Sequence, residues 1–499
     1  MHPPSRSTCF HALLLLAASS TFVACSHSTQ EPSAEKGPEK LTQAALSKAT
    51  AGQFQPVPLP DPGISGYKFP EAEDTIDSWT KSGNQQAVDL HAWGLWTALT
   101  KETDQKFNGQ KLLVFETWND PSDLVPTPPT AAGRRVRIPQ RLTRPKQFQH
   151  DAAAQSLPTA AGQPGAVSVD VKYDPTAADF ILNNGLLSAA QLTSYLNTDH
   201  KTAVPAFPAT AVSLKPTYRT VKPLVDNRYF MLKVWPGPPP LVFNPTSKLW
   251  ESKPFPDTLW GQCVWIDIQG SGNTGAGVDK TCAVNGSSRT AASTYGIDQF
   301  IHFQMTQAAA DQINTATSDT TSVSAGDYVV LVGMHATSRE ITRWTWQSFW
   351  WVNAPDNPAA PSSASIASHR PAQLSGAPRH YAQCAGYDEA LPPQPSIGGS
   401  NVGETVYCYN PYLEAPFPSS ALPDSQPGDI RMNGKIVKTA NNVGVQTNCM
   451  SCHEQATYNP NKISPAPRYT GARYVDLNSP AFNGALKVDF LWSISDDAQ

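Results

Sequence analysis

The sequence lacks a basic excess, and it lacks long apolar segments beyond its first residues. Its 37 Lys and Arg against 41 Asp and Glu leave a formal net charge of −4. A chain that binds nucleic acid ordinarily carries a strong positive excess or a basic stripe. After the first 25 residues, no run approaches the roughly 20 apolar residues that a membrane-spanning helix needs. The composition therefore argues against a nucleic-acid partner and against further membrane-spanning segments.

The signatures of several enzyme classes are missing as well. The chain contains no G-x-S-x-G elbow, no H-E-x-x-H pair, no P-loop and no EF-hand loop, so hydrolase chemistry has no motif behind it. One glycine pattern, at 270–275, matches G-x-G-x-x-G after an expected strand, but no convincing helix follows it. We interpret that segment as a loop, and we predict no catalytic residues.

Proline and glycine are plentiful, with 46 and 31 of the 499 residues. Connections stiffened by proline argue against a helical bundle. Apolar, β-branched and aromatic runs predict strands, whereas apolar spacing of three to four residues predicts helices. The expected strands are 112–115, 168–171, 229–232, 264–268, 300–305 and 328–334, and the expected helices are 88–99, 177–182 and 189–196. We therefore predict an α+β fold with a β-rich, loop-rich body, long Pro/Gly connections and a short helical segment near the C-terminus.

The first 24 residues have the features of a secretory signal peptide. An apolar run with four consecutive leucines follows Arg6, and Phe22-Val23-Ala24-Cys25 resembles a bacterial lipobox. That resemblance implies a lipid on Cys25 and, with Ser26 next, a place in the periplasm on the outer rather than the inner membrane; a plain secretory signal is the alternative. Residues 25–60 contain few large apolar side chains and predict a flexible tether.

Near the C-terminus the chain reads Cys449-Met450-Ser451-Cys452-His453. Covalent haem attachment uses two thiols that reach the two vinyl groups and an adjacent imidazole that ligates the iron. The C-x-x-C-H pattern supplies all three within one helical turn. A disulfide redox pair would need a thioredoxin-like context, and half of a zinc site would need a second Cys/His pair at suitable spacing; neither is present.

The segment 448–456 resembles the attachment site of bacterial monohaem c-type cytochromes, here in the form of a cytochrome c family lipoprotein with a single C-terminal motif. The resemblance implies one covalent haem c, with thioether bonds at Cys449 and Cys452 and with His453 as the proximal iron ligand. It also implies electron transfer with a redox partner protein in the periplasm or membrane. Unlike in small soluble cytochromes c, the residues after His453 contain neither Met nor His. Any sixth ligand must therefore come from upstream.

His335 is the first candidate for that distal iron ligand. It follows the apolar run 328–334, where a strand end can present it to a pocket, and a run of aromatic residues at 344–351 lies close behind. That aromatic run is either a flat wall for a haem or ordinary core. For each histidine candidate, the alternative is a side chain that binds no metal. The other candidates are His91, His302, His380 and Met432.

Cys9 belongs to the signal peptide, and four further cysteines remain once the lipid and haem positions are assigned: Cys263, Cys282, Cys384 and Cys408. In an oxidising compartment an even number of cysteines predicts disulfides, and three pairings are open. We favour the two local pairs, Cys263 with Cys282 and Cys384 with Cys408, because each would close a Gly- or Pro-rich loop.

The predicted organisation is a signal peptide at 1–24, the tether at 25–60, the β-rich body at 61–425 and a haem-attachment segment at 426–499 packed on that body. Electron transfer is the leading functional hypothesis. The alternative is a haem enzyme or gas-binding protein, such as a peroxidase or small-molecule oxidase, with an open distal site. The large body and the missing downstream ligand favour this alternative. A third hypothesis is docking to a larger complex through the lipid anchor and the basic residues of 134–146.

Overall fold

The structure is a computed structural model, and it describes residues 54–125, 139, 142, 167–239, 242–246, 248–251, 255–270, 275–316, 323–391, 404–416, 429–432, 435–438, 449–461 and 475–499. The chain divides into two compact units, Met1–Ala51 and Gly52–Gln499, and the described residues belong to the second. The predicted signal peptide, Cys25 and the basic residues of 134–146 lie outside the described residues.

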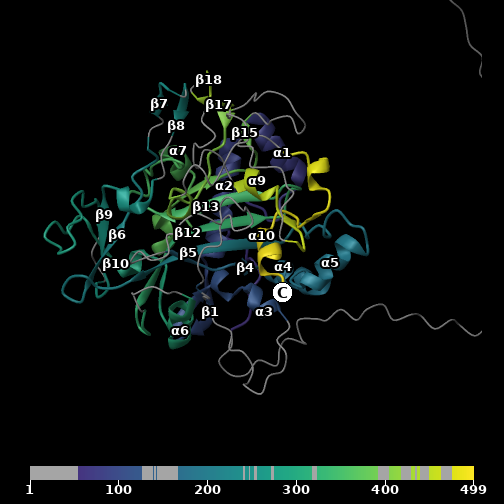
Figure 1. The fold of residues 1–499 in the computed structure, drawn as a ribbon. Helices are drawn as coiled ribbons and strands as arrows, with labels where there is room; N and C mark the ends of the chain where they lie inside the picture. Colours follow the sequence, from purple (N-terminus) through teal and green to yellow (C-terminus); the bar gives the residue numbers. More distant parts are fainter. Residues whose placement is uncertain are drawn as a thin grey trace, which may run out of the picture. The chain divides into compact units, whose positions relative to one another are not determined.

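A seven-stranded sheet forms the centre of the described unit (Figure 1). Its main path runs β14-β13-β12-β5-β3, with β11 beside β12 and β4 beside β5. All of these pairs are antiparallel. The strands are β3 (Val167–Val169), β4 (Lys172–Tyr173), β5 (Val212–Val221), β11 (His302–Gln304), β12 (Tyr328–Ser338), β13 (Thr345–Trp351) and β14 (Tyr381–Ala385).

Smaller sheets surround this one. A three-stranded sheet contains β6 (Tyr229–Lys233), β9 (Cys263–Asp267) and β10 (Thr294–Gly296). The two-stranded sheets are β1 (Glu102–Phe107) with β2 (Gln110–Leu113), β7 (Val242–Asn244) with β8 (Leu249–Glu251), β15 (Ala390–Leu391) with β16 (Glu404–Thr405), β17 (Asp429–Met432) with β18 (Lys435–Lys438), and β19 (Thr457–Tyr458) with β20 (Leu486–Lys487).

Helices accompany the sheets, so the predicted α+β class is confirmed. They are α1 (Glu73–Ser82), α2 (Gln85–Leu99), α3 (Pro121–Leu124), α4 (Pro175–Asn184), α5 (Ala189–Asn197), α6 (Gln307–Ala316), α7 (Ala364–Ser368), α8 (Pro411–Glu414), α9 (Cys449–His453) and α10 (Trp492–Asp497). In the part of the chain that the structure describes, no helix has both the length and the apolar character that crossing a membrane requires.

Local sequence explains where the predicted helices begin and end. The side chain of Asp174 caps α4 by accepting the amides of Thr176 and Ala177, and a proline occupies the first helical position. Gly185 ends the same helix with φ of 60°, a left-handed conformation that glycine adopts without strain. Asn84 caps α2 in the same manner as Asp174, by accepting the amide of Ala87.

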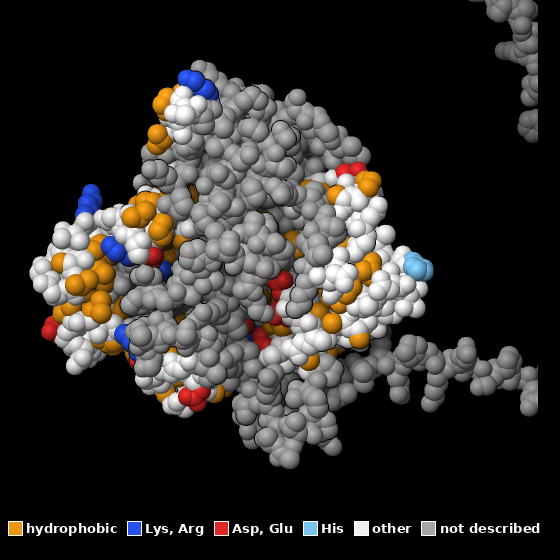
Figure 2. Space-filling view, in the orientation of Figure 1, with side chains coloured by type: hydrophobic (Ala, Val, Ile, Leu, Met, Phe, Trp, Pro, Cys, Tyr) orange, Lys and Arg blue, Asp and Glu red, His pale blue; other side chains and the backbone are white. Residues whose placement is uncertain are grey.

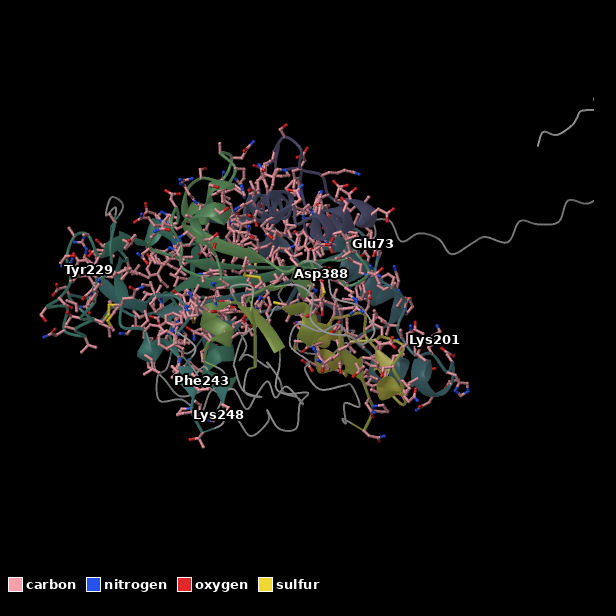
Figure 3. The ribbon with its side chains drawn as sticks, turned by 90° about the horizontal axis from the view of Figure 1, so that it is seen from above. Glu73, Lys201, Tyr229, Phe243, Lys248 and Asp388 are labelled. Atoms are coloured by element: carbon pink, nitrogen blue, oxygen red, sulfur yellow. A yellow bond between two sulfur atoms is a disulfide. The ribbon has the colours of Figure 1, made fainter. Side chains whose placement is uncertain are left out.

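Strand β13 separates two layers of core. Its side chains alternate between the two faces of the sheet. Phe349 stacks on Trp96 of α2, with ring centroids 4.5 Å apart, whereas Trp346 packs on His453 of α9, with centroids 4.2 Å apart. Figure 3 shows the same division, with the N-terminal helices in purple on one side of the sheet and the C-terminal segment in yellow on the other. The aromatic run 344–351 thus contributes to both layers.

The described body already includes the end of the predicted tether. Phe54 is 3% exposed and packs edge-to-face on Phe107, with centroids 5.9 Å apart. The carbonyl of Val57 accepts a hydrogen bond of 2.7 Å from the indole N–H of Trp118. These contacts hold residues from Phe54 onward against the body.

Exposed apolar side chains are scattered over the surface. Figure 2 shows hydrophobic atoms reaching the surface over the region of β6, β9 and β10. The large exposed ones among the described residues are Leu182, Leu224, Val242, Phe243, Leu259 and Val284. Single exposed apolar side chains are ordinary on protein surfaces, so they carry no functional assignment here.

Candidate functional site

The C-x-x-C-H segment forms the short helix α9, Cys449–His453. Residues three and four apart on a helix share a face, so the two cysteines and the histidine project from the same side of this turn. Met450 is 1% exposed and belongs to the hydrophobic core that also contains Trp346 of the sheet. This buried methionine anchors the helix to the body.

The chain that follows the motif orients His453. Its Nδ1 donates a hydrogen bond of 2.7 Å to the carbonyl oxygen of Phe490. A carbonyl can only accept, so Nδ1 carries the proton and the lone pair of the neutral ring lies on Nε2. The indole N–H of Trp492 donates to the carbonyl of Cys452 at 3.3 Å. The tail therefore holds both the imidazole and the helix that presents it.

Adjacent strands place a row of side chains beside α9. Lys215 of β5 lies opposite His335 of β12, His335 lies opposite Ser348 of β13, and Ser348 lies opposite Cys384 of β14. Side chains directly opposite one another share a face of the sheet. The sulfur of Cys449 lies 3.8 Å from Nδ1 of His335, so this row faces the motif.

Both ring nitrogens of His335 have partners within the protein. Nδ1 lies 2.6 Å from the hydroxyl of Ser348, and Nε2 lies 2.8 Å from Oε1 of Glu414 in α8. Burial is the largest single effect and lowers the pKa of His335, but the charges of Glu414 and Cys449 and the hydrogen bonds to them together outweigh it and raise the pKa to about 10. The imidazole is therefore a cation at neutral pH in this arrangement, and it must release a partner before it can ligate a metal.

Burial also determines the state of the second thiol. It raises the pKa of Cys452 to about 12, against the lowering effect of the Lys215 ammonium. Burial lowers the pKa of Lys215 in turn. Cys452 is thus a protonated thiol at neutral pH, with Lys215 of the neighbouring sheet beside it.

Both favoured disulfides are confirmed: Cys263 pairs with Cys282, and Cys384 pairs with Cys408. Asp279 lies beside the first pair in an arrangement with metal-ligand spacing, but sulfurs bonded to each other do not supply thiolates. The second pair borders the motif, because the carbonyl oxygen of Cys408 lies 4.0 Å from the sulfur of Cys449.

The segment that carries Cys408 covers the sheet next to the motif. A side-chain carbon added at Gly333 of β12 would lie 2.4 Å from Nδ2 of Asn410, so only a glycine lets this segment approach so closely. Glu414, four residues further on, reaches His335. A cavity of about 220 Å³ adjoins the edge strand β14, and its lining includes Gln85 of α2 and Ile366 of α7 as well as Cys384.

The other candidate ligands are placed differently from His335. His91 lies in α2, where Nδ1 is 2.7 Å from the hydroxyl of Tyr387 and Nε2 is 3.0 Å from Glu340. Because α2 and α9 pack on opposite faces of the sheet, His91 is directed away from the motif. His302 lies in β11, 2.8 Å from the carbonyl of Phe300. His380 ends a 3₁₀ turn, Ala377–His380, and Met432 ends β17.

Comparison with protein-family models, curated proteins and solved structures gives no match. The functional argument therefore rests on the residues of this chain.

Sequence reasoning identified the motif and His335 but missed three of the groups around them, Lys215, Ser348 and Glu414. The alternation of the β12–β13 hairpin offers a signal for Ser348, because a hairpin pairs residues on the same face. Lys215 and Glu414 come from segments far away in the chain, and nothing in their local sequence marks them.

Proposed function

We propose that this chain is a c-type cytochrome that carries one covalent haem c and exchanges electrons with a redox partner protein in the periplasm or membrane. The observation that supports this proposal most directly is the helical C-x-x-C-H turn, whose histidine is oriented by a hydrogen bond from Nδ1 to the Phe490 carbonyl. Its two thiols remain outside disulfides. Two thiols followed by an imidazole are the donor set that haem c requires, so the residues fit this group in kind and in order.

In this proposal Cys449 and Cys452 would hold the macrocycle through thioether bonds, and Nε2 of His453 would ligate the iron. The bound haem supplies a one-electron redox centre. The hydrogen bond to Phe490 fixes the tautomer of His453 and makes its other nitrogen a better donor. Trp346, packed 4.2 Å from the imidazole ring, restricts rotation of that ring and keeps water from one side of it.

His335 remains the proposed distal ligand. Its imidazole contacts Cys449 and projects from the central strand β12. To bind iron it has to exchange its hydrogen bond with Glu414 or Ser348 for the metal and lose its charge. Retention of both hydrogen bonds would instead leave the distal position open, as in the alternative of a haem enzyme or gas-binding protein.

The proposal extends to the N-terminus. A lipid on Cys25 would hold the protein at the membrane surface in the periplasm, in the outer rather than the inner membrane. Cys25→Ser should release the protein into the soluble periplasmic fraction. If this variant stays with the membranes, the lipid anchor is wrong while the haem proposal stands.

Haem that survives denaturing electrophoresis tests the central proposal. The wild-type protein should keep haem stain on the denatured chain, and Cys449→Ala combined with Cys452→Ala should lose it. The matched control is Cys263→Ala combined with Cys282→Ala, which removes the same number of sulfurs and should keep the stain. Stain that persists without the motif cysteines, or that is absent from the wild type, contradicts the proposal.

Optical spectra with and without carbon monoxide decide between the two functions. A six-coordinate low-spin spectrum that carbon monoxide leaves unchanged supports electron transfer. A high-spin spectrum that carbon monoxide alters readily supports the enzyme or gas-binding alternative. If His335 ligates the iron, His335→Ala converts the low-spin spectrum to high spin, whereas Ser348→Ala leaves the spin state unchanged. An unchanged spectrum in His335→Ala removes His335 as the ligand.

A further inference from the structure

A carboxyl group without a hydrogen-bond partner lies close to the motif. Glu389, at the start of the β15 hairpin, is 0% exposed, and neither of its side-chain oxygens has a partner among the described residues. Its backbone is held firmly, because its amide donates to Asp388 at 2.7 Å and its carbonyl accepts from Val406 at 3.1 Å. Burial of a polar group without a partner costs free energy, so the ionised form is strongly disfavoured here.

The positive charge near Glu389 is already engaged by another carboxylate. Glu454, the residue after His453, forms an ion pair with Arg343 and accepts the amide of Val475 at 2.8 Å. Arg343 in turn donates to the carbonyl of Val475 at 3.1 Å. This clamp joins α9, the β12–β13 turn and the tail, and it satisfies Glu454 rather than Glu389.

Three charged groups face Glu389 in the described structure, namely Glu454, Asp388 and Arg343. Figure 3 labels Asp388, which in that view lies between the purple N-terminal helices and the yellow C-terminal segment. If Glu389 also ionised, three carboxylates would share one guanidinium in a buried region. Repulsion between like charges then adds to the cost of burial.

The proton of this cluster rests on Glu389. Burial raises the pKa of Glu389 far above its usual range, Glu454 and Asp388 raise it further, and Arg343 only partly opposes them. Burial raises the pKa of Glu454 as well, to about 8, but Arg343 and the Val475 amide favour its ionised form. Glu389 has no such donor among the described residues, so of the two carboxyls it keeps its proton to the higher pH.

We infer that Glu389 is a proton-exchange residue linked to the redox state of the haem, an inference that rests on the proposed function. Transfer of one electron from the bound haem to the redox partner would leave one additional positive charge next to α9. Release of the Glu389 proton to solvent then returns the net charge of the region to its earlier value. Reduction takes up one electron from the redox partner and one proton from solvent. Glu389 interacts electrostatically with Glu454, which is joined to His453 by a peptide bond, and this interaction is the proposed link between Glu389 and the haem.

The reduction potential as a function of pH tests this inference on the purified holoprotein. The potential should fall as pH rises above the usual range of a glutamate, with a slope no steeper than roughly 59 mV per tenfold change in proton concentration for a one-electron couple. Glu389→Gln mimics the protonated acid permanently. Its potential should stay near the acid limit of the wild type across the whole range.

The matched control is Glu102→Gln, which alters an exposed carboxylate of β1 and should keep the wild-type slope. A flat wild-type potential overturns the inference, and so does a slope that survives in Glu389→Gln. Redox-difference infrared spectroscopy adds a readout on the wild type alone, should the variant fold poorly. The carbonyl band of a protonated carboxyl should disappear on oxidation, and its absence from the difference spectrum overturns the inference. If the denatured chain carries no haem, the proposed function fails first, so the two failures are distinguishable.

Discussion

Replacing Cys384 and Cys408 together by alanine removes the disulfide that borders the motif. The bond closes a loop with a sequence separation of 24, and the loop-entropy relation assigns such a loop about 3.4 kcal/mol of unfolding free energy. The disulfide between Cys263 and Cys282 has a separation of 19, for which the same relation gives about 3.2 kcal/mol. The two double variants should therefore lose nearly equal stability.

Their effects on the haem should differ, because the two disulfides lie in different places. Cys384 belongs to the row of side chains that includes His335 and Ser348, and the Cys408 carbonyl lies 4.0 Å from the Cys449 sulfur. Loss of this bond frees the segment that also carries Glu414. We expect a changed haem spectrum and a shifted reduction potential in Cys384→Ala with Cys408→Ala, but not in the control pair.

Urea unfolding followed by tryptophan fluorescence measures the stability, and absorbance with potentiometry measures the haem. Equal losses of stability with a haem effect confined to the Cys384–Cys408 pair would support the reasoning. Identical haem spectra and potentials in both variants would refute the role assigned to this disulfide. A loss far below about 3 kcal/mol in both would show that loop entropy does not govern their contribution.

Three further substitutions test the contacts around the site. Gly333→Ala places a carbon 2.4 Å from Asn410 and should cost about 1–3 kcal/mol in urea unfolding, as overpacked cores do; no loss means that Asn410 moves freely. The pKa of His335 is raised to about 10, so its pair with Glu414 stabilises the fold fully below about pH 6.5 and progressively less as pH rises toward 10. In the haem-free double cysteine variant, Glu414→Gln should flatten this decline in urea-unfolding stability, and an unchanged decline would assign it to another group. The hydroxyl of Tyr67 is buried without a partner among the described residues, so Tyr67→Phe should leave the thermal midpoint unchanged or raise stability by about 1 kcal/mol; a marked drop would show that the hydroxyl is satisfied.

Regular spacing made several elements predictable. The apolar positions of 88–99 recur every three to four residues, and α2 covers this segment. Runs of apolar and aromatic residues predicted β6, β9 and β12 within a few residues of their bounds. In these segments, burial of one helix face or of a whole strand leaves a direct mark on the sequence.

Strand β5 was missed although it lies at the centre of the large sheet. Pro216 interrupts its sequence, and proline is normally excluded from central strands because it cannot donate to the ladder. The sheet accommodates Pro216 because the two strands that pair with β5 are irregular near this residue. The partner strand is divided into β3 and β4 at this level, and β12 shifts register between Leu331 and Gly333. A local sequence pattern cannot predict irregularities in the neighbouring strands, so it cannot show that proline is tolerated in β5.

The candidate site divides in the same way. The motif is local, so its chemistry follows from spacing alone. The surroundings of His335 depend on strand register and on α8, and the unpartnered state of Glu389 depends on how Arg343 divides its hydrogen bonds. These contacts join residues that are far apart in the chain, so they cannot be predicted from local sequence patterns.

The hydrogen bond between His453 and Phe490 joins residues separated by 37 positions in the chain, and this has a consequence for biogenesis. A protein chain emerges from its N-terminus, so the two cysteines and the histidine become available before the carbonyl that orients the ring. A chain interrupted between His453 and Phe490 would retain every atom needed to attach the haem but not the acceptor that fixes the imidazole. Under the proposed function, haem attachment and the orientation of His453 would therefore be separable events in maturation.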